Sequence, residues 1–231
     1  MPGPPLQAVH TVRDGAIEII RLDAGKLNVL TPEVATSLRA AVDEAIARDD
    51  VGAIALLGNE RAFSAGLDTA TLAAGGDAAR SLLRTIGELL TTLYGSSTPV
   101  VAGCAGHAVA AGAMVLLVSD TRVAAAGSYR VGFTEVAMGL PLPELALVLA
   151  RERLDPRRLQ LATAAGHVFE PNEAAAAGFV DSVVAVEELE NAVLSEAGRL
   201  AELDRAAYGE TIAALRGPAL ARMRVLVDAL R

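Results

Sequence analysis

Up to about Leu142, the chain alternates between short apolar runs and longer segments with helical spacing of apolar residues. The short runs predict strands at 8–12, 16–22, 51–57, 99–104 and 122–126. The longer segments predict helices at 31–48, 81–94 and 111–119. Asp14-Gly15 marks a turn between the first two strands, and Thr31 and Pro32 are suited to begin the first helix. Strands that alternate with helices predict a parallel α/β fold with right-handed crossovers.

Beyond Leu142 the pattern becomes almost entirely helical. The predicted helices cover 143–153, 156–165, 171–177, 186–203 and 205–230, with one strand at 179–184. We expect the last helix to break at Gly217-Pro218, because proline removes a backbone donor and clashes with the preceding turn. Apolar positions surround the segment 218–230, so it is expected to pack against its own domain or a partner subunit.

The composition suits one globular protein, with 231 residues of which 52% are apolar. A net charge of -8 without basic blocks argues against a nucleic-acid partner. The only cysteine, Cys104, excludes an intramolecular disulfide, and the three histidines show no zinc-type spacing, so no metal site is expected. No apolar run reaches the roughly 20 residues that span a membrane, and residues 1–5 do not resemble a signal peptide. A cytoplasmic protein without a membrane partner is therefore expected.

Two short glycine-containing stretches carry the candidate chemistry: 62–68, AFSAGLD, and 106–112, GHAVAAG. Each follows an apolar run that predicts a strand, and the second leads into a predicted helix. A tight turn that opens into a helix leaves backbone N–H groups unpaired at the positive end of the helix dipole. Two such turns can form an oxyanion hole from backbone alone. This pattern indicates carbonyl chemistry without a serine, cysteine or metal nucleophile.

With these motifs the chain resembles the crotonase superfamily of enoyl-CoA hydratases and isomerases. The stretch 62–68 matches the typical first motif at every fixed position, and the second motif keeps its frame with Ala110 and Ala111 in place of two glycines. The resemblance implies a spiral of ββα units with the acyl-CoA site in residues 1–180. It further implies a C-terminal helical region, 181–231, that covers the coenzyme A pocket and assembles homotrimers or dimers of trimers.

The resemblance also implies an acyl-CoA substrate whose thioester oxygen accepts hydrogen bonds from the N–H groups of Leu67 and Ala111. Alanine tolerates a positive φ poorly, so we expect conventional backbone angles at the two alanine replacements. Glu135 corresponds to a catalytic glutamate of the family and lies in a mostly apolar stretch, where its pKa can rise toward that of a useful base. Coenzyme A enters with the substrate, and no separate cofactor is expected.

Met114 stands where family hydratases carry a second glutamate. One carboxylate is similar to the pattern of Δ3,Δ2-enoyl-CoA isomerases, because moving a proton from C2 to C4 requires only one base. We therefore predict an isomerase, with a hydratase that uses Glu135, alone or with Glu144, as one alternative. Glu144 is either such a second acid or a first-turn glutamate that the helix dipole favours. A non-catalytic acyl-CoA binding protein is the other alternative.

Other residues are candidates for substrate contact or for structural roles. The resemblance places Lys26 and Asn28 near the coenzyme A nucleotide. The full set of predicted substrate contacts is Lys26, Asn28, Ala65, Gly66, Met114, Phe133, Met138 and Glu144. Asp68 and Asp120 are expected to stabilise a turn and a helix end, and a structural role is favoured for His107. A Rossmann enzyme and a serine hydrolase are both disfavoured, because neither glycine signature is present.

Overall fold

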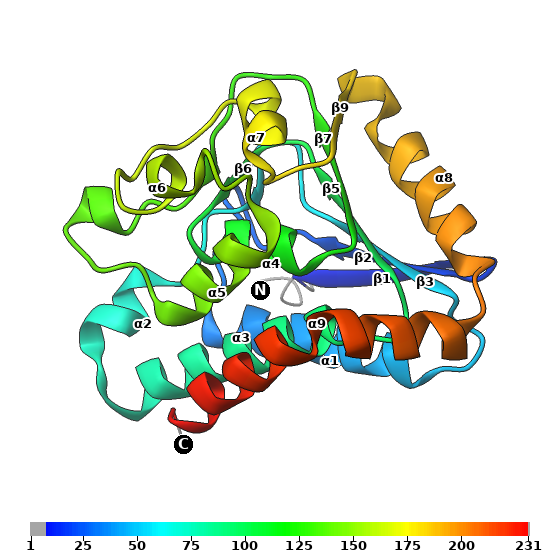
Figure 1. Cartoon of the computed structure of the whole chain (residues 1–231), viewed down its shortest axis with the longest axis horizontal. Helices are drawn as coiled ribbons and strands as arrows, with labels where there is room; N and C mark the ends of the chain where they lie inside the picture. The colour runs from blue at the N-terminus through cyan, green and yellow to red at the C-terminus, as the bar shows by residue number, and fades with distance from the viewer. Residues whose placement is uncertain (1–7, 231) are drawn as a thin grey trace, which may run out of the picture.

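A six-stranded sheet forms the centre of this computed structural model, which describes residues 8–230 (Figure 1). Its strands lie in the order β1 (Val9–Asp14), β2 (Ile17–Leu22), β3 (Ala53–Leu57), β5 (Val100–Cys104), β7 (Thr121–Ala125) and β9 (Ser182–Val184). The β1–β2 pair is the predicted antiparallel hairpin, and each later pair is parallel. The predicted parallel α/β arrangement is therefore confirmed. The opening residues considered for a signal peptide lie outside the described residues.

Three very short strands form a second, parallel sheet beside the first: β4 (Ala62–Ser64), β6 (His107–Val109) and β8 (Val131–Gly132). The sequence did not predict this sheet, because strands of two or three residues display no periodicity. Its functional importance lies in the residues that each strand leads into. Gly66 comes after β4, Ala110 after β6 and Glu135 after β8, so the small sheet aligns the three candidate segments.

Between residue 8 and β7, the helices are α1 (Pro32–Ala47), α2 (Thr69–Ala74), α3 (Gly76–Tyr94) and α4 (Ala111–Val118). The Thr31 side chain accepts a hydrogen bond from the Val34 N–H, which confirms the predicted cap of α1. The short helix α2 was not predicted. The Asp68 carboxylate accepts hydrogen bonds from the N–H groups of Ala70 and Thr71 at its start, so Asp68 has the expected structural role.

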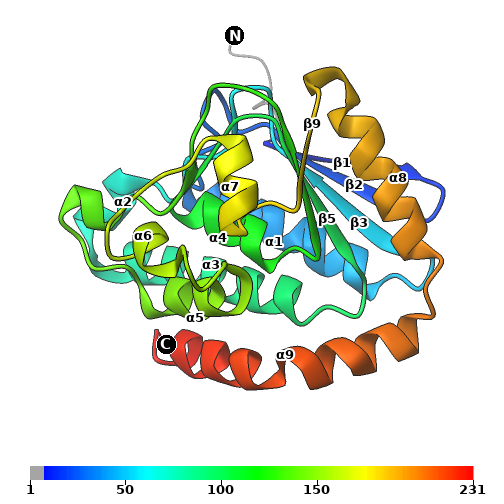
Figure 2. The same ribbon diagram turned by 45° about the horizontal axis from the view of Figure 1, so that its top comes forward.

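The second half contains η1 (Val136–Met138), α5 (Glu144–Arg153), α6 (Leu159–Ala162), α7 (Pro171–Ala177), η2 (Val186–Glu188), α8 (Leu189–Ala201) and α9 (Arg205–Asp228). In Figure 2, α8 crosses one face of the six-stranded sheet, while α9 runs along the opposite side below α3 and α5. Buried apolar residues on α8 form one cluster with the sheet, and the larger core lies on the other face. No helix within residues 8–230 has the length and apolar character needed to cross a membrane.

Helix α9 continues through Pro218, so the predicted break at Gly217-Pro218 is wrong. A residue before proline usually leaves the helical conformation because its Cβ and N–H clash with the proline ring. Gly217 has no Cβ, which relieves part of this clash. The neighbouring Ala219 and Leu220 are buried, and their packing holds the helix together across the missing hydrogen bond.

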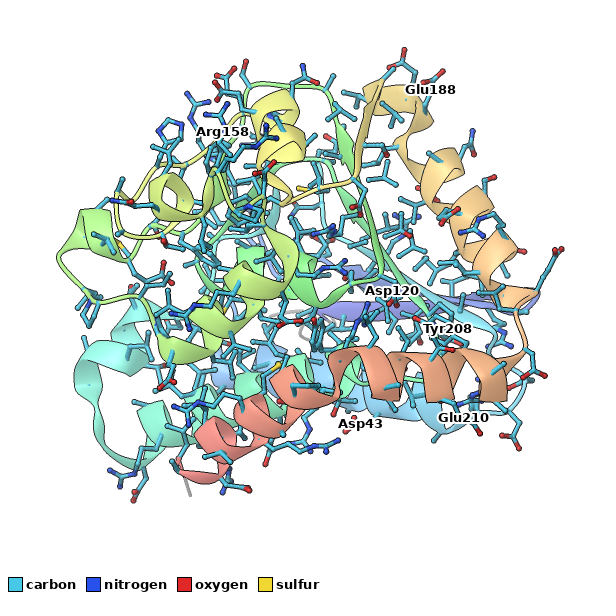
Figure 3. The ribbon with its side chains drawn as sticks, viewed as in Figure 1. Asp43, Asp120, Arg158, Glu188, Tyr208 and Glu210 are labelled. Atoms are coloured by element: carbon cyan, nitrogen blue, oxygen red, sulfur yellow. The ribbon has the colours of Figure 1, made fainter. Side chains whose placement is uncertain are left out.

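Asp120 links α9 to the central sheet. Its carboxylate accepts hydrogen bonds from the Val100 N–H and from Arg216 of α9, both at 2.7 Å. Figure 3 shows Asp120 at the edge of α9 with Tyr208 beside it. The Arg216 guanidinium also lies over the ring of Tyr94, 4.5 Å from its centre. The predicted structural role of Asp120 at a helix end is confirmed.

Candidate active site

The turns after β4 and β6 lie in direct contact. A Cβ added to Gly66, whose φ is +93°, would lie 3.0 Å from the Ala110 Cβ and 3.3 Å from the Ala111 nitrogen. A Cβ added to Gly112 would lie only 2.1 Å from the Ser64 oxygen. The backbones therefore approach so closely that only glycine fits at these two positions.

The two predicted oxyanion donors lie in these neighbouring turns. The Leu30 N–H donates to the Gly66 oxygen at 2.8 Å, and the Asp68 N–H donates to the Leu30 oxygen at 3.1 Å. This pairing uses the groups on either side of Leu67 and does not involve its N–H. Ala111 is the first residue of α4, so helix geometry gives its N–H no partner inside the helix. Both amides therefore remain suited to bind a developing negative charge.

Ala110, just before α4, has a φ of 51° and a ψ of -123°. The expectation of conventional angles at both alanine replacements is wrong at this position. The neighbours impose the conformation: the Ala110 N–H donates to the Gly132 oxygen at 3.0 Å, while its own oxygen accepts from Ala113 and Met114 in α4. The sequence did hint at this unusual backbone conformation, because the motif that the chain resembles has a glycine at the position of Ala110. Strain of about 1–3 kcal/mol is typical of such a residue.

Glu135 is the first residue of the turn after β8, and it is only 8% exposed. Burial raises the pKa of its carboxyl group above the ordinary value, while hydrogen bonds from the N–H groups of Glu135 and Thr134 lower it in part. The Thr134 N–H lies 2.9 Å from Oε2. Met114, in α4, is 7% exposed and offers no proton acceptor. The site therefore combines backbone donors, a buried carboxylate and an apolar side chain at position 114.

Comparison with known proteins identifies the family. Residues 13–223 match the family model described as enoyl-CoA hydratase/isomerase. The chain belongs to the enoyl-CoA hydratase/isomerase family. Its fold is therefore the predicted crotonase-like α/β fold with a C-terminal helical region, and it is an enzyme of this superfamily.

Relatives within the family carry both reaction names. A Mycobacterium tuberculosis structure described as an enoyl-CoA isomerase is 37% identical, with a TM-score of 0.91 and coverage of 96% of this chain and 97% of that one. A second structure of that mycobacterial protein, with a TM-score of 0.92, describes it as a probable enoyl-CoA hydratase. A Mycobacterium avium protein named as a probable enoyl-CoA hydratase is 29% identical over 188 residues, which cover 81% of this chain and 73% of the relative.

Asn28 is a structural residue in this family member, which corrects its prediction as a substrate contact. Its side chain is fully buried, with Oδ1 accepting from the Ala24 N–H at 2.8 Å. Its Nδ2 donates to the Leu22 oxygen at 2.8 Å and to the Ala62 oxygen at 2.9 Å. These bonds tie the end of β2 to the first motif. The side chain therefore stabilises the first motif through these hydrogen bonds, and both of its polar groups are used within the protein.

Glu144 is bound to the C-terminal helix α9. It is the first residue of α5, half-exposed, and its Oε1 accepts a hydrogen bond from Arg222 Nε of α9 at 2.9 Å. Of the two roles considered for Glu144, the first-turn glutamate is the one the structure supports. The bond to Arg222 weighs against its prediction as a substrate contact or second acid.

The remaining candidates divide between core and surface. Phe133 is fully buried with its ring 5.5 Å from that of Phe179, which agrees with core packing, and its contact with substrate stays a prediction. Met138 is exposed on η1. Lys26 lines an open groove of about 730 Å³ beside the carboxyl ends of β2 and β3. His107 Nδ1 accepts from the Arg130 N–H at 3.1 Å, in agreement with its structural interpretation.

Proposed function

We propose that this chain is an enoyl-CoA isomerase that moves the double bond of a 3-enoyl-CoA thioester to the 2 position. The observation that carries the proposal is that the candidate residues include one buried carboxylate, Glu135, and an apolar Met114 on the helix that offers the second backbone donor. Glu135 then has to remove and return the proton alone. Isomerisation needs one such group, whereas hydration also has to position and activate water.

In the proposed reaction, the Glu135 carboxylate removes a proton from C2 of the substrate. The electron pair of that C–H bond becomes part of a dienolate with negative charge on the thioester oxygen. The N–H groups of Leu67 and Ala111 stabilise this charge, and the loss of one such donor typically lowers the rate by about 10²–10³-fold. The protonated Glu135 then delivers the proton to C4, which restores the thioester carbonyl and leaves the new double bond between C2 and C3.

The raised pKa of Glu135 supports this role, because a general base is most effective when its pKa lies near the working pH. The substrate brings coenzyme A, with Lys26, Ala65, Gly66 and Met138 as proposed contacts, and the proposal includes no further cofactor. Residues 1–180 would hold the site, with 181–231 covering the coenzyme A pocket and forming a homotrimer or dimer of trimers. We place the protein in the cytoplasm.

A hydratase is the second candidate, and the hydratase names of relatives favour it. In that reaction Glu135 would activate water for addition to C3 of a 2-enoyl-CoA. The methionine at position 114 weighs against it, because hydratases of the resembled pattern carry a second acid there. An acyl-CoA binding protein without turnover is the third outcome that the experiment distinguishes.

The test is to supply 3-enoyl-CoA and 2-enoyl-CoA separately and to follow the absorbance of the conjugated thioester. We expect conversion of the 3-enoyl substrate, reduced by about 10²–10⁴-fold in Glu135→Gln. Glu144→Gln is the matched control and should retain wild-type turnover, since Glu144 faces α9. Hydration of 2-enoyl-CoA without isomerisation would favour the second candidate, and binding without turnover would favour the third.

The pH dependence supplies a further readout of the same prediction. Glu135 has to be deprotonated to accept a proton, and burial raises its pKa. Turnover should therefore decline on acidification at a pH above the ordinary range of a carboxyl group. The residual activity of Glu135→Gln should lack this acidic limb, and an unchanged limb would assign it to another group.

A further inference from the structure

The turn that carries Glu135 lies against the residues that come after α6. We call residues 166–169 the support segment. In Figures 1 and 2, η1 lies near α6, on the side of the molecule opposite α8. The support segment returns along β8, where Val131 and Phe169 exchange both backbone hydrogen bonds, each at 2.9 Å. The strand that leads to Glu135 is thus paired with a segment far from it in the sequence.

The contact continues from β8 into the turn. A Cβ on Gly132 would lie 3.4 Å from the His167 oxygen and from the Val168 Cα. A Cβ on Gly166 would lie 3.2 Å from the Ala137 nitrogen and 3.5 Å from the Ala137 Cβ. Moving forward from β8 into the turn, each contact is therefore made by an earlier residue of the support segment. The last of these contacts joins Gly166 to Ala137 in the turn.

Gly166 suits this position for two independent reasons. Its φ of +62° lies in the left-handed region, where a side chain is strained. Any Cβ would also approach the backbone of the turn more closely than most real contacts allow. The Gly166 N–H donates to the Thr163 oxygen at 3.1 Å, which fixes the support segment to the end of α6.

Little side-chain packing holds the turn itself. Val136 is 37% exposed and Met138 is 57% exposed. Inside the turn, the Glu135 oxygen accepts from the Met138 N–H at 3.0 Å and from the Leu140 N–H at 2.9 Å. These bonds fix the shape of the turn but not its place in the molecule. Its place depends on β8 at one end and on the close approach of Gly166 behind it.

We propose that Gly166 is a positioning residue for Glu135. The inference rests on the proposed function, in which the Glu135 carboxylate moves the proton. By allowing the turn to lie directly on the support segment, Gly166 sets where the carboxylate meets the substrate carbon. Displacement of a reacting group by about 1 Å can lower a rate by about 10²-fold, so a shift of a few tenths of an ångström has a measurable effect.

The test compares Gly166→Ala with Gly15→Ala. Gly15 lies in the β1–β2 turn with a φ of +56°, and nothing lies within 4 Å of a Cβ added there. Both variants introduce similar backbone strain, but only one pushes on the turn of Glu135. We expect Gly166→Ala to lower kcat by about 10–100-fold with KM nearly unchanged, while Gly15→Ala keeps both. A kcat equal to that of Gly15→Ala, or an effect confined to KM, would overturn the proposal.

A double-variant cycle separates positioning from a general structural effect. In a Glu135→Gln background, Gly166→Ala should cause no further loss of turnover, because the carboxylate that it positions is absent. A further loss of the same size in that background would overturn the proposal. If Glu135→Gln alone keeps full turnover, the proposed function fails. If Glu135→Gln loses turnover and Gly166→Ala does not, only the positioning role fails.

Val168→Ala extends the test if Gly166→Ala does not fold. The Val168 Cγ1 lies 3.5 Å from the Cβ position of Gly132, so the substitution loosens the neighbouring contact between the support segment and β8 without backbone strain. Like Gly166→Ala, this variant should have a lower kcat than the wild type, with KM preserved. An unchanged kcat in folded Val168→Ala would then refute the role of the support segment.

Discussion

Replacing Ala110 by glycine should stabilise the protein. Ala110 has a φ of 51° and a ψ of -123°, a combination that glycine adopts readily and alanine does not. Strain of this kind typically amounts to about 1–3 kcal/mol. Glycine gains about 0.4–1 kcal/mol of extra conformational freedom in the unfolded chain, which offsets part of the benefit. We expect Ala110→Gly to raise the free energy of unfolding by about 1 kcal/mol.

The assay is urea unfolding followed by circular dichroism, supported by thermal unfolding. For a chain of this size, about 1 kcal/mol corresponds to a shift in Tm of about 2–4 °C. Ala113→Gly is the matched control, since Ala113 lies fully buried within α4. The same chemical change there should lower the free energy of unfolding by about 1 kcal/mol or more, because glycine is unfavourable inside a helix.

Opposite signs at two positions so close along the chain would establish the strain at Ala110. A loss of stability in Ala110→Gly, comparable to that of Ala113→Gly, would refute the reasoning. Turnover should remain near the wild-type value in Ala110→Gly, because the neighbouring donor is the main-chain N–H of Ala111 and glycine preserves the backbone. A large loss of turnover would mean that the Ala110 methyl group itself contributes to the site.

Two further predictions concern Met114 and the attachment of α9. Met114→Glu should raise hydration of 2-enoyl-CoA at least about tenfold if a second acid is what the site lacks, and no gain in a folded variant contradicts that assignment. Arg216→Met should lower the free energy of unfolding by about 3–5 kcal/mol in urea unfolding, because the Asp120 carboxylate then stays buried without its cationic partner. The double variant Arg216→Met with Asp120→Asn should recover part of this loss, and equal losses in the single and double variants would exclude the ion pair as the cause.

The sequence predicted those elements whose stability depends on their own periodicity. The β1–β2 hairpin, helix α1 with its Thr31 cap and the buried strands β3 and β5 all arise from local patterns. The break at Pro218 was predicted wrongly because the helix depends on packing that a local rule does not include. The small sheet was not predicted because its strands are fixed by pairing between distant segments.

The candidate site shows the same contrast between features that a local sequence pattern determines and features that depend on contacts between distant segments. Glu135 was a candidate because the family resemblance places a catalytic glutamate there, in a mostly apolar stretch, and the structure shows the residue buried. Asn28 was misjudged because its partners lie on β2 and in the first motif, and the bond from Arg222 of α9 to Glu144 could not be predicted, because the sequence does not place these elements relative to one another. The support at Gly166 could not be predicted at all. Its contact with Ala137 exists only once the segment after α6 has folded back along β8.

Helix α4 explains why the backbone amide of Ala111 can serve as one of the proposed donors. All residues of α4 are buried and apolar, so no polar face or solvent screens its dipole. The unpaired N–H of Ala111 therefore presents partial positive charge inside an apolar environment.

The carboxyl end of α4 needs hydrogen-bond donors, because buried carbonyl groups without partners are destabilising. Arg153 Nη2 supplies them by donating to the oxygens of Ser119 at 2.7 Å and Asp120 at 3.1 Å. Burial lowers the pKa of Arg153 to about 10, which still leaves it charged at neutral pH. A cation at the carboxyl end and an unpaired donor at the amino end make α4 a polarised element directed at the proposed thioester oxygen.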